Sequence, residues 1–315
     1  MRERTGAAQA LRLDSRGPRG QTSPPAKGMW RMTRALVLGG GGPLGVAWES
    51  GLIAGFAQGG VDLGEADFIL GTSAGAIVGA RLASGGASAR LADAVLDPAS
   101  VNIRPPGGSQ DGFTKMMGLM REAQTGTRHP AEVRRELGAL ALSAEAASEA
   151  DFLELMGREL GPIPHQGWPA RDFACTAVDV EDGGFQLWQA SSGVDLLPAV
   201  ASSACVPGLV TPITLQGRRY MDGGMRSPTN ADLAAGHELV VVIAVAPPGG
   251  PTQRLDEEVE SLKAVGATVV AITLDEAAGA AFGPNPMDSA RKPDVARAGL
   301  AQALSQAEIL KSVWG

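Results

Sequence analysis

The fold follows from one stretch, Phe68-Ile69-Leu70-Gly71-Thr72-Ser73-Ala74-Gly75-Ala76-Ile77-Val78-Gly79. Its apolar beginning predicts a buried strand and its run of small residues predicts a helix, with the pattern Gly-x-Ser-x-Gly in the turn between them. Such a turn holds the serine, here Ser73, at its tip and at the N-terminus of the helix, where the helix dipole favours developing negative charge. A five-residue pattern also fits an ordinary turn rich in glycine and serine, so the rest of the chain has to decide.

Composition limits the classes of protein that this chain can belong to. Its 315 residues are 44% hydrophobic and 19% charged, which is enough apolar material for a substantial core. The formal net charge of −7 argues against a surface that binds nucleic acid. Cys175 and Cys205 lie among apolar residues without metal-ligand spacing, so we expect buried thiols and neither a metal site nor a disulfide.

The beginning of the chain predicts no membrane anchor. Residues 1–31 are rich in Arg, Gly and Pro and lack the apolar segment of a secretory signal, so we interpret them as a disordered N-terminal extension. No apolar run approaches the length of about 18 residues that a transmembrane helix needs. We therefore expect a cytoplasmic protein that is at most peripheral at a membrane.

A second glycine-rich turn lies upstream of the first. The apolar run Ala35–Leu38 predicts a buried parallel strand, Gly39–Gly45 follows it directly, and the apolar positions of residues 46–56 fit a helix. Together with the strand that carries Ser73, this order predicts a βαβ unit. Both glycine turns then lie at the carboxyl edge of a parallel sheet.

Downstream, one segment differs from the rest. Residues from about 97 to 168 contain a Pro-Gly break and then helical patterns, including Ala131–Ala147, which predict a helical cap inserted beside the sheet. After it, apolar runs predict strands at 173–179, 185–188, 239–245 and 268–274, and helical patterns cover 196–203, 255–265 and 293–314. We expect one α/β domain over residues 32–315, with the cap as an insert.

The upstream glycine turn allows two interpretations. Gly40–Gly45 matches Gly-x-Gly-x-x-Gly, and Asp62 follows at about the distance of a ribose-binding acid, as in a dinucleotide-binding protein. However, the next strand ends in the Ser73 turn, where that acid would be expected. Alternatively, the bare amides of the loop form an oxyanion hole beside Ser73, and this second interpretation is favoured.

A serine nucleophile needs a base. Of the three histidines, His237 has the chain order of a triad but directly precedes a buried strand, which puts it at the wrong edge of the sheet, and His129 and His165 flank the cap beside prolines. Asp222 follows a predicted strand and precedes Gly223-Gly224. An Asp-Gly turn alone is an ordinary turn signal, but with the two glycine turns it favours Asp222 as a direct base.

These motifs together resemble the patatin-like phospholipase family. Gly40–Gly45, Gly71–Gly75 and Asp222–Gly224 occur in the family's order, and Ala201–Gly208 resembles its Ala-Ser-x-x-x-x-Pro segment. The resemblance implies a three-layer α/β/α fold with a mainly parallel central sheet and a lipid acyl hydrolase without metal or cofactor. The family usually has Arg or Lys at the position of Leu44, which puts a preference for anionic head groups in doubt.

By position in these motifs, Ser73 corresponds to the nucleophile and Asp222 to the base of a Ser-Asp dyad. The oxyanion hole corresponds to Gly40, Gly41 and Gly42. The turns of these motifs would be shaped by Gly45, Gly71, Gly75, Gly223 and Gly224. The expected substrate is a lipid or another acyl ester. A non-catalytic lipid- or acyl-binding protein and a nucleotide-binding oxidoreductase remain the alternatives.

Overall fold

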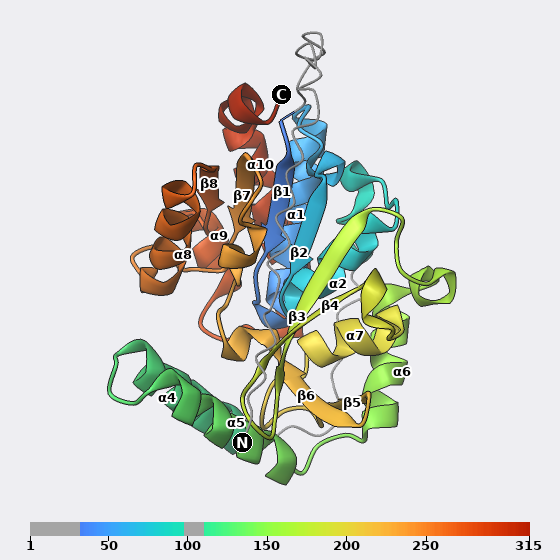
Figure 1. Ribbon diagram of the computed structural model, residues 1–315. Helices are drawn as coiled ribbons and strands as arrows, with labels where there is room; N and C mark the ends of the chain where they lie inside the picture. The colour runs from blue at the N-terminus through green and yellow to red at the C-terminus, as the bar shows by residue number, and fades with distance from the viewer. Residues whose placement is uncertain (1–31, 98–109) are drawn as a thin grey trace, which may run out of the picture. The chain divides into compact units, whose positions relative to one another are not determined.

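A mainly parallel sheet forms the centre of the fold (Figure 1). In the computed structural model, which describes residues 32–97 and 110–315, five parallel strands neighbour one another in the order β3-β2-β1-β7-β8. They are β1 (Arg34–Leu38), β2 (Phe68–Gly71), β3 (Asp172–Asp179), β7 (Leu239–Ile243) and β8 (Thr268–Ile272). Three antiparallel strands complete the sheet beside β3, namely β4 (Phe185–Gln189), β5 (Ile213–Leu215) and β6 (Arg218–Asp222).

The central strands are apolar on both faces because helices cover both sides of the sheet. On β1, Leu36 and Leu38 belong to one hydrophobic cluster, and the alternate residues Ala35 and Val37 belong to the other. Period-two alternation sends neighbouring side chains to opposite faces, so a continuous apolar run is what a doubly covered strand requires. The predicted three-layer α/β/α fold with a mainly parallel sheet is confirmed.

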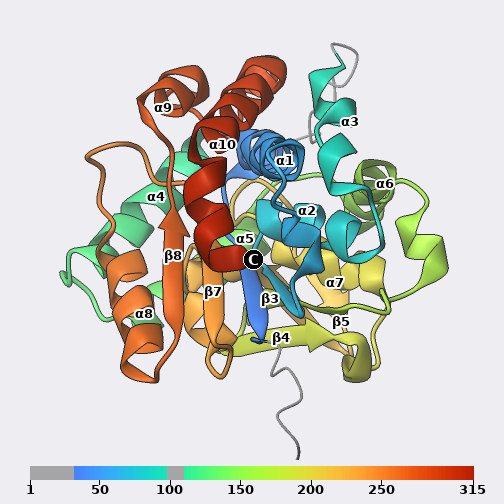
Figure 2. The same cartoon turned by 90° about the horizontal axis from the view of Figure 1, so that it is seen from above.

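The larger helical layer covers the face of the sheet on which Leu36 and Leu38 lie, and its helices contribute side chains to the same hydrophobic cluster. They are α1 (Gly42–Gln58), α2 (Ala74–Ala83), α3 (Asp93–Leu96), α6 (Glu149–Leu160), α7 (Leu196–Ser203), α9 (Glu276–Phe282) and α10 (Lys292–Trp314). The opposite face packs against α8 (Gln253–Ala264). Figure 2 shows α1 and α10 side by side in the larger layer.

Glycines allow α1 and α10 to pack backbone against backbone. Gly51, Gly55 and Gly59 are spaced four residues apart and therefore share one face of α1. A Cβ at Gly51 would overlap the carbonyl of Ala296, and one at Gly55 would lie 2.5 Å from the carbonyl oxygen of Leu300. The apolar pattern of α1 thus reflects a helix that is buried on nearly every side.

The segment that the sequence sets apart as a cap divides between two environments. The helix predicted from Ala131 to Ala147 ends earlier, as α5 (Pro130–Ser143), and Ser148 then caps the separate helix α6 by accepting the amide of Asp151 at 3.2 Å. Helix α4 (Gln110–Gln124) and α5 form a hydrophobic cluster with β3 and β6, whereas α6 joins the main core. Figure 1 shows α4 and α5 beyond the carboxyl edge of the sheet.

Two predictions fall partly or wholly outside the structure. Residues 1–31, predicted to be a disordered extension, and residues 98–109 of the predicted cap lie outside the described residues. In the part of the chain that is described, no helix combines the length and apolar character needed to cross a membrane.

Candidate active site

The Gly-x-Ser-x-Gly turn joins β2 directly to α2, as predicted. Ser73 has a φ of 54° and a ψ of −114°, a conformation that residues other than glycine rarely adopt and that a sharp strand-to-helix turn imposes. Gly75 has to lack a side chain because a Cβ there would overlap the carbonyl group of Leu38. At Gly71 a Cβ would lie 2.5 Å from the Cα of Ala76. The turn therefore fits only with glycine on both sides of the serine.

The pairing of β2 and β6 with β3 places Asp222 next to the turn that carries Ser73. Strand β4 occupies one edge of β3 along Ala174–Val178, so β2 and β6 share the other edge and run toward one another. The last residue of β2 pairs with Cys175, and Asp222, the last residue of β6, pairs with Ala177 only two positions further along β3. The chain turns away from β2 at Ser73, and the two strand ends meet with Ser73 and Asp222 beside each other.

Asp222 is buried and hydrogen-bonded at this junction. Its residue is 2% exposed, and burial raises its pKa to about 6, although hydrogen bonds from the Ser73 side chain and the Gly224 amide act in the opposite direction. The Gly224 amide donates to Oδ1 of Asp222 at 2.7 Å. A Cβ on Gly223 would overlap the side chain of Thr176, so the Asp-Gly-Gly turn needs its first glycine to approach β3. A carboxylate with a pKa near 6 is a better proton acceptor than an exposed one.

A buried polar network ties the two turns together, and the sequence analysis missed it. The hydroxyls of Thr72 and Thr176 lie 2.9 Å apart. The side-chain amide of Asn230 donates to Thr72 Oγ1 at 3.1 Å, to the carbonyl of Ser227 at 2.8 Å and to that of Gly223 at 3.3 Å. Asn230 has a φ of 53°, a left-handed conformation in which Asn is enriched. This angle is known only from the structure, and the sequence around Asn230 gives no direct sign of its role.

The segment 201–208, noted for its family resemblance, also supports the site. Ser203 Oγ accepts the amide of Ser73 at 3.0 Å, and the carbonyl of Cys205 accepts the amide of Asp222 at 2.9 Å. One segment therefore holds the backbone of both candidate catalytic residues. Both cysteines are free and buried, as predicted.

The glycine loop lies against Ser73, but one of its three expected oxyanion donors is engaged elsewhere. The amide of Gly40 donates to the carbonyl of Pro228 at 2.8 Å, so the prediction that Gly40 contributes a donor has to be corrected. A Cβ on Gly40 would lie 3.4 Å from the Cβ of Ser73, and close approach is the role that remains for it. Among the described residues, the amides of Gly41 and Gly42 donate to no backbone carbonyl outside regular structure.

Helix α1 follows the glycine loop and packs against the beginning of α2. A Cβ on Gly45 would lie 3.1 Å from the Cβ of Ala74 at the start of α2, so the helices that follow the two glycine turns are in close contact. One turn further along α1, Glu49 is fully buried, and its carboxylate oxygens have no hydrogen-bond partner among the described residues. Burial raises the pKa of Glu49 well above its ordinary value, against the lowering effect of the Gly39 amide. The raised pKa favours the protonated, neutral form of this buried carboxyl group.

Ser73 opens into a small apolar cavity of about 110 Å³. The cavity lies between the glycine loop, the beginning of α2, helix α6 and the beginning of α10. Its lining includes two charged residues, Glu159 and Lys292, among side chains that are otherwise mostly apolar. The lining residues are Gly42, Pro43, Val46, Ser73, Ala74, Ile77, Phe152, Leu155, Met156, Glu159, Ala204, Val206, Leu209, Val210, Met287 and Lys292.

The histidines do not reach this site. His237 precedes β7, whose first residue pairs with the first residue of β1, so it lies at the amino edge of the sheet, opposite Ser73. Its ring stacks on Phe68 with a centroid distance of 5.3 Å. His129 and His165 are exposed, and His129 caps α5. The predicted exclusion of a histidine triad agrees with this geometry.

Asp62 is not available for a ribose either. Its Oδ1 accepts the amide of Gly64 at 2.8 Å and the hydroxyl of Ser88 at 2.5 Å. It caps a short helical turn that precedes β2, at the amino edge of the sheet and therefore opposite the glycine loop. The arrangement is that of a structural cap, and it removes the residue on which the dinucleotide interpretation relied.

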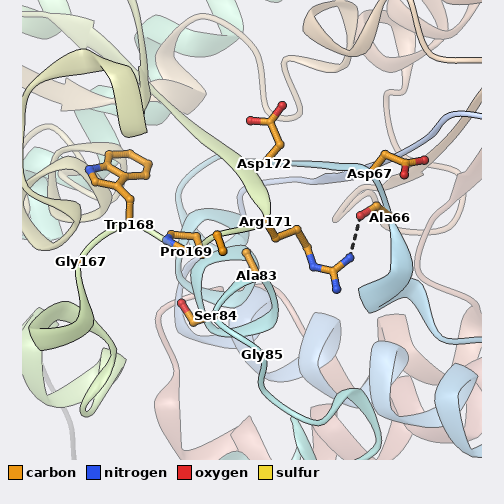
Figure 3. Close-up of a pocket in the computed structure, with 11 residues that line it drawn as sticks. Ala66, Asp67, Ala83, Ser84, Gly85, Gly167, Trp168, Pro169, Arg171 and Asp172 are labelled. Carbon is orange, nitrogen blue, oxygen red and sulfur yellow. Dashed lines mark hydrogen bonds between the residues drawn. The ribbon is translucent and has the colours of Figure 1, made fainter.

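A larger hollow of about 780 Å³ lies at the amino ends of β2 and β3 (Figure 3). It is lined by Asp67 and Asp172 beside those strands and by Trp168, and Arg171 donates to the carbonyl of Ala66 at 2.9 Å. None of the candidate catalytic residues lines it, so its size does not make it the active site. Within the described residues, no three carboxylate, imidazole or thiol groups are grouped to hold a metal ion.

Comparisons with known proteins agree with the site motifs. The family model described as patatin-like phospholipase matches residues 36–235. Two similar solved structures are VipD from Legionella pneumophila (14% identity, TM-score 0.43, covering 88% of this chain and 67% of that one) and the type III effector protein ExoU (19% identity, TM-score 0.35, covering 88% and 54%). This chain therefore spans about half the length of the second. No curated protein matches the chain.

Proposed function

This chain belongs to the patatin-like phospholipase family, and from that premise we propose that it is a serine acyl hydrolase that cleaves carboxylic esters of lipids through a Ser73-Asp222 dyad. Family membership supports a lipid hydrolase. The observation that carries the finer proposal is the buried pair itself, in which a carboxylate with a pKa of about 6 interacts with the hydroxyl of a serine in a strained turn. Contact with a membrane would be interfacial.

The first half of the reaction forms an acyl-enzyme. Asp222 takes the hydroxyl proton of Ser73 while Oγ bonds to the ester carbonyl carbon, and the carbonyl oxygen becomes an oxyanion. The amides of Gly41 and Gly42 and the N-terminus of α2 stabilise that charge, and one such donor is typically worth about 2.7–4 kcal/mol. The carbon–oxygen bond to the leaving alcohol then breaks, and the alcohol takes the proton from Asp222.

The second half releases the acid. Asp222 takes a proton from water, the resulting hydroxide bonds to the acyl carbon, and the same donors hold the second oxyanion. The bond to Ser73 Oγ breaks as Oγ recovers its proton from Asp222. Each half thus uses the carboxylate once as base and once as acid, which suits a pKa near neutrality.

A fluorophosphonate probe and a short p-nitrophenyl ester test the proposal. A short ester is chosen because the cavity beside Ser73, about 110 Å³, is smaller than the pockets of about 300–1,000 Å³ that hold drug-sized ligands. We expect labelling and turnover with the wild type, neither with Ser73→Ala, and unchanged behaviour with Ser261→Ala, an exposed serine on α8. If Ser73→Ala labels as strongly as the wild type, Ser73 is not the nucleophile. Binding of acyl esters without turnover would instead favour a non-catalytic acyl-binding protein.

A further inference from the structure

A buried lysine without a hydrogen-bond acceptor lines the cavity beside Ser73. Lys292, the first residue of α10, is only 4% exposed, and it belongs to the cavity lining together with Ser73 and Gly42. Its ammonium nitrogen lies 3.9 Å from Glu159 Oε1, which is too far for a hydrogen bond. Among the described residues it donates no hydrogen bond, although an ammonium group carries three donors.

The charge of this lysine is not balanced by its neighbour. Glu159 is shared with Arg81, whose guanidinium lies 3.1 Å from Glu159 Oε2 and also contacts the Glu159 carbonyl. Arg81 therefore satisfies Glu159 at the closer distance, and the three side chains together carry one net positive charge. Burying charge that is only partly compensated is costly, so the excess positive charge favours an anion in this cavity.

The first turn of α10, where Lys292 lies, is level with the beginning of α1. Helices α1 and α10 run in the same direction, because Gly51 faces Ala296 and Gly55 faces Leu300. On this register Lys292 lies level with Ala47, two residues beyond Gly45, which corresponds to about 3 Å of helix rise. Gly45 in turn faces Ala74, the residue after Ser73.

The segment before α10 also contacts the glycine loop. The carbonyl of Pro286 accepts the amide of Leu44 at 3.3 Å, and a Cβ on Gly42 would lie 2.8 Å from the terminal methyl of Met287. Lys292 is therefore connected through a short stretch of chain to the loop that holds the candidate oxyanion donors.

We propose that Lys292 binds an anionic oxygen that the substrate carries a few bonds from the scissile ester, so that esters with such a group are preferred over neutral ones. This inference rests on the proposed hydrolase function. The anion has two possible sources, a carboxylate on the acyl chain or a phosphate on the alcohol that leaves. Both present the charged oxygen that an ammonium group recognises.

Two pairs of esters distinguish these sources. The first pair is p-nitrophenyl hexanoate and the mono-p-nitrophenyl ester of adipic acid, which differ by a carboxylate on the acyl side. The second pair is 1-hexanoylglycerol and its 3-phosphate, which differ by an anion on the leaving-group side. We expect the wild type to prefer the anionic member of one pair by about 10- to 100-fold in kcat/KM, mainly through KM, as for a hydrogen bond to a charged group.

Variants of α10 assign the preference to Lys292. Lys292→Gln should abolish it, Lys292→Arg should retain it, and Lys311→Gln, an exposed lysine on the same helix, should leave it unchanged. The ratio of kcat/KM for the two esters of a pair is measured on one protein sample. A variant that is only partly folded therefore lowers both values equally and leaves the ratio unchanged. The proposal is overturned if the wild type does not discriminate within either pair, or if Lys292→Gln keeps the wild-type ratio.

A binding measurement separates this proposal from the proposed function. Titration calorimetry of the same esters with Ser73→Ala, with and without Lys292→Gln, needs no turnover. Tighter binding of the anionic esters that disappears with Lys292→Gln supports the role of Lys292 even if the wild type hydrolyses none of them, in which case the hydrolase proposal alone fails. Equal binding of all four esters with both proteins rejects the role of Lys292.

Discussion

Replacing Asp222 by Asn tests whether the candidate base is held at a cost to stability. The pKa of Asp222 is about 6 in the folded protein, against an ordinary value of 3.8. A difference of one in pKa corresponds to 1.36 kcal/mol, so the ionised carboxylate destabilises the fold by about 3 kcal/mol. Between these two pKa values the folded protein holds a proton that the unfolded chain has lost, and wild-type stability therefore falls as pH rises.

The Asn side chain is neutral at every pH and retains an oxygen to accept the Gly224 amide. We therefore expect the stability of Asp222→Asn relative to the wild type to increase by about 2–3 kcal/mol from about pH 4 to about pH 8, most of it below pH 7. Urea unfolding at a series of pH values measures this difference. In the same range, wild-type kcat/KM should rise with an apparent pKa of about 6, and the variant should lose about 10²–10⁴-fold in rate.

Asp232→Asn is a matched control. Burial raises the pKa of Asp232, but the hydrogen bond and the charge of Arg226 lower it by a larger amount. Its pKa therefore lies below the ordinary value. The stabilisation from this ion pair is present above the unfolded pKa and is lost only as pH falls through the lower folded value. The difference between Asp232→Asn and the wild type should therefore be nearly constant above about pH 5. If the free energy of unfolding of Asp222→Asn differs from that of the wild type by the same amount at every pH from 4 to 8, the pKa of Asp222 is not raised and the reasoning is refuted.

Three other substitutions test the surrounding structure. Ser203→Ala leaves the buried amide of Ser73 without its acceptor, so we expect a loss of about 1–3 kcal/mol in urea unfolding together with lower esterase activity; unchanged stability would contradict this. Gly75→Ala should cost about 3 kcal/mol or more because its Cβ meets backbone, whereas Gly118→Ala, in the open interior of α4, should stabilise by up to about 1 kcal/mol. Glu49→Gln should gain stability relative to the wild type as pH rises, since the pKa of this buried acid is raised, and an equal difference at pH 5 and pH 8 would contradict a raised pKa.

Local patterns were sufficient for the first βαβ unit, whereas the proposed dyad of Ser73 and Asp222 rested on motifs far apart in the chain and on their resemblance to a family. A strand, a glycine turn and a helix are each encoded within about ten residues, and the carboxyl ends of the parallel strands β1 and β2 meet at one edge by topology. Asp222 reaches this edge on the antiparallel strand β6, which that rule does not cover. The exclusion of His237 followed from the same rule, since the amino end of a parallel strand lies at the other edge. In the cap, the helix predicted for Ala131–Ala147 ends at Ser143, and Ser148 then caps the separate helix α6.

Residues that act through distant contacts could not be predicted in this way. Nothing near Gly40 in the sequence indicates that its amide is bonded to Pro228, 188 positions away. Asn230 and Ser203 contribute single hydrogen-bonding atoms to turns elsewhere in the chain. Lys292 is one of many charged residues in the sequence, and only the packing of α10 on α1 distinguishes it as a buried one.

The antiparallel strand β6 explains how the proposed mechanism can use an aspartate as its base without a histidine. A parallel sheet brings only the carboxyl ends of its strands to the edge where Ser73 lies, and β6 reaches that edge by running in the opposite direction along the extension of β3. Asp222 thereby arrives at the end of a strand, inside the core, instead of on an exposed loop. The burial that follows raises its pKa toward neutrality, so the same feature of the fold positions the proposed base and adjusts its strength.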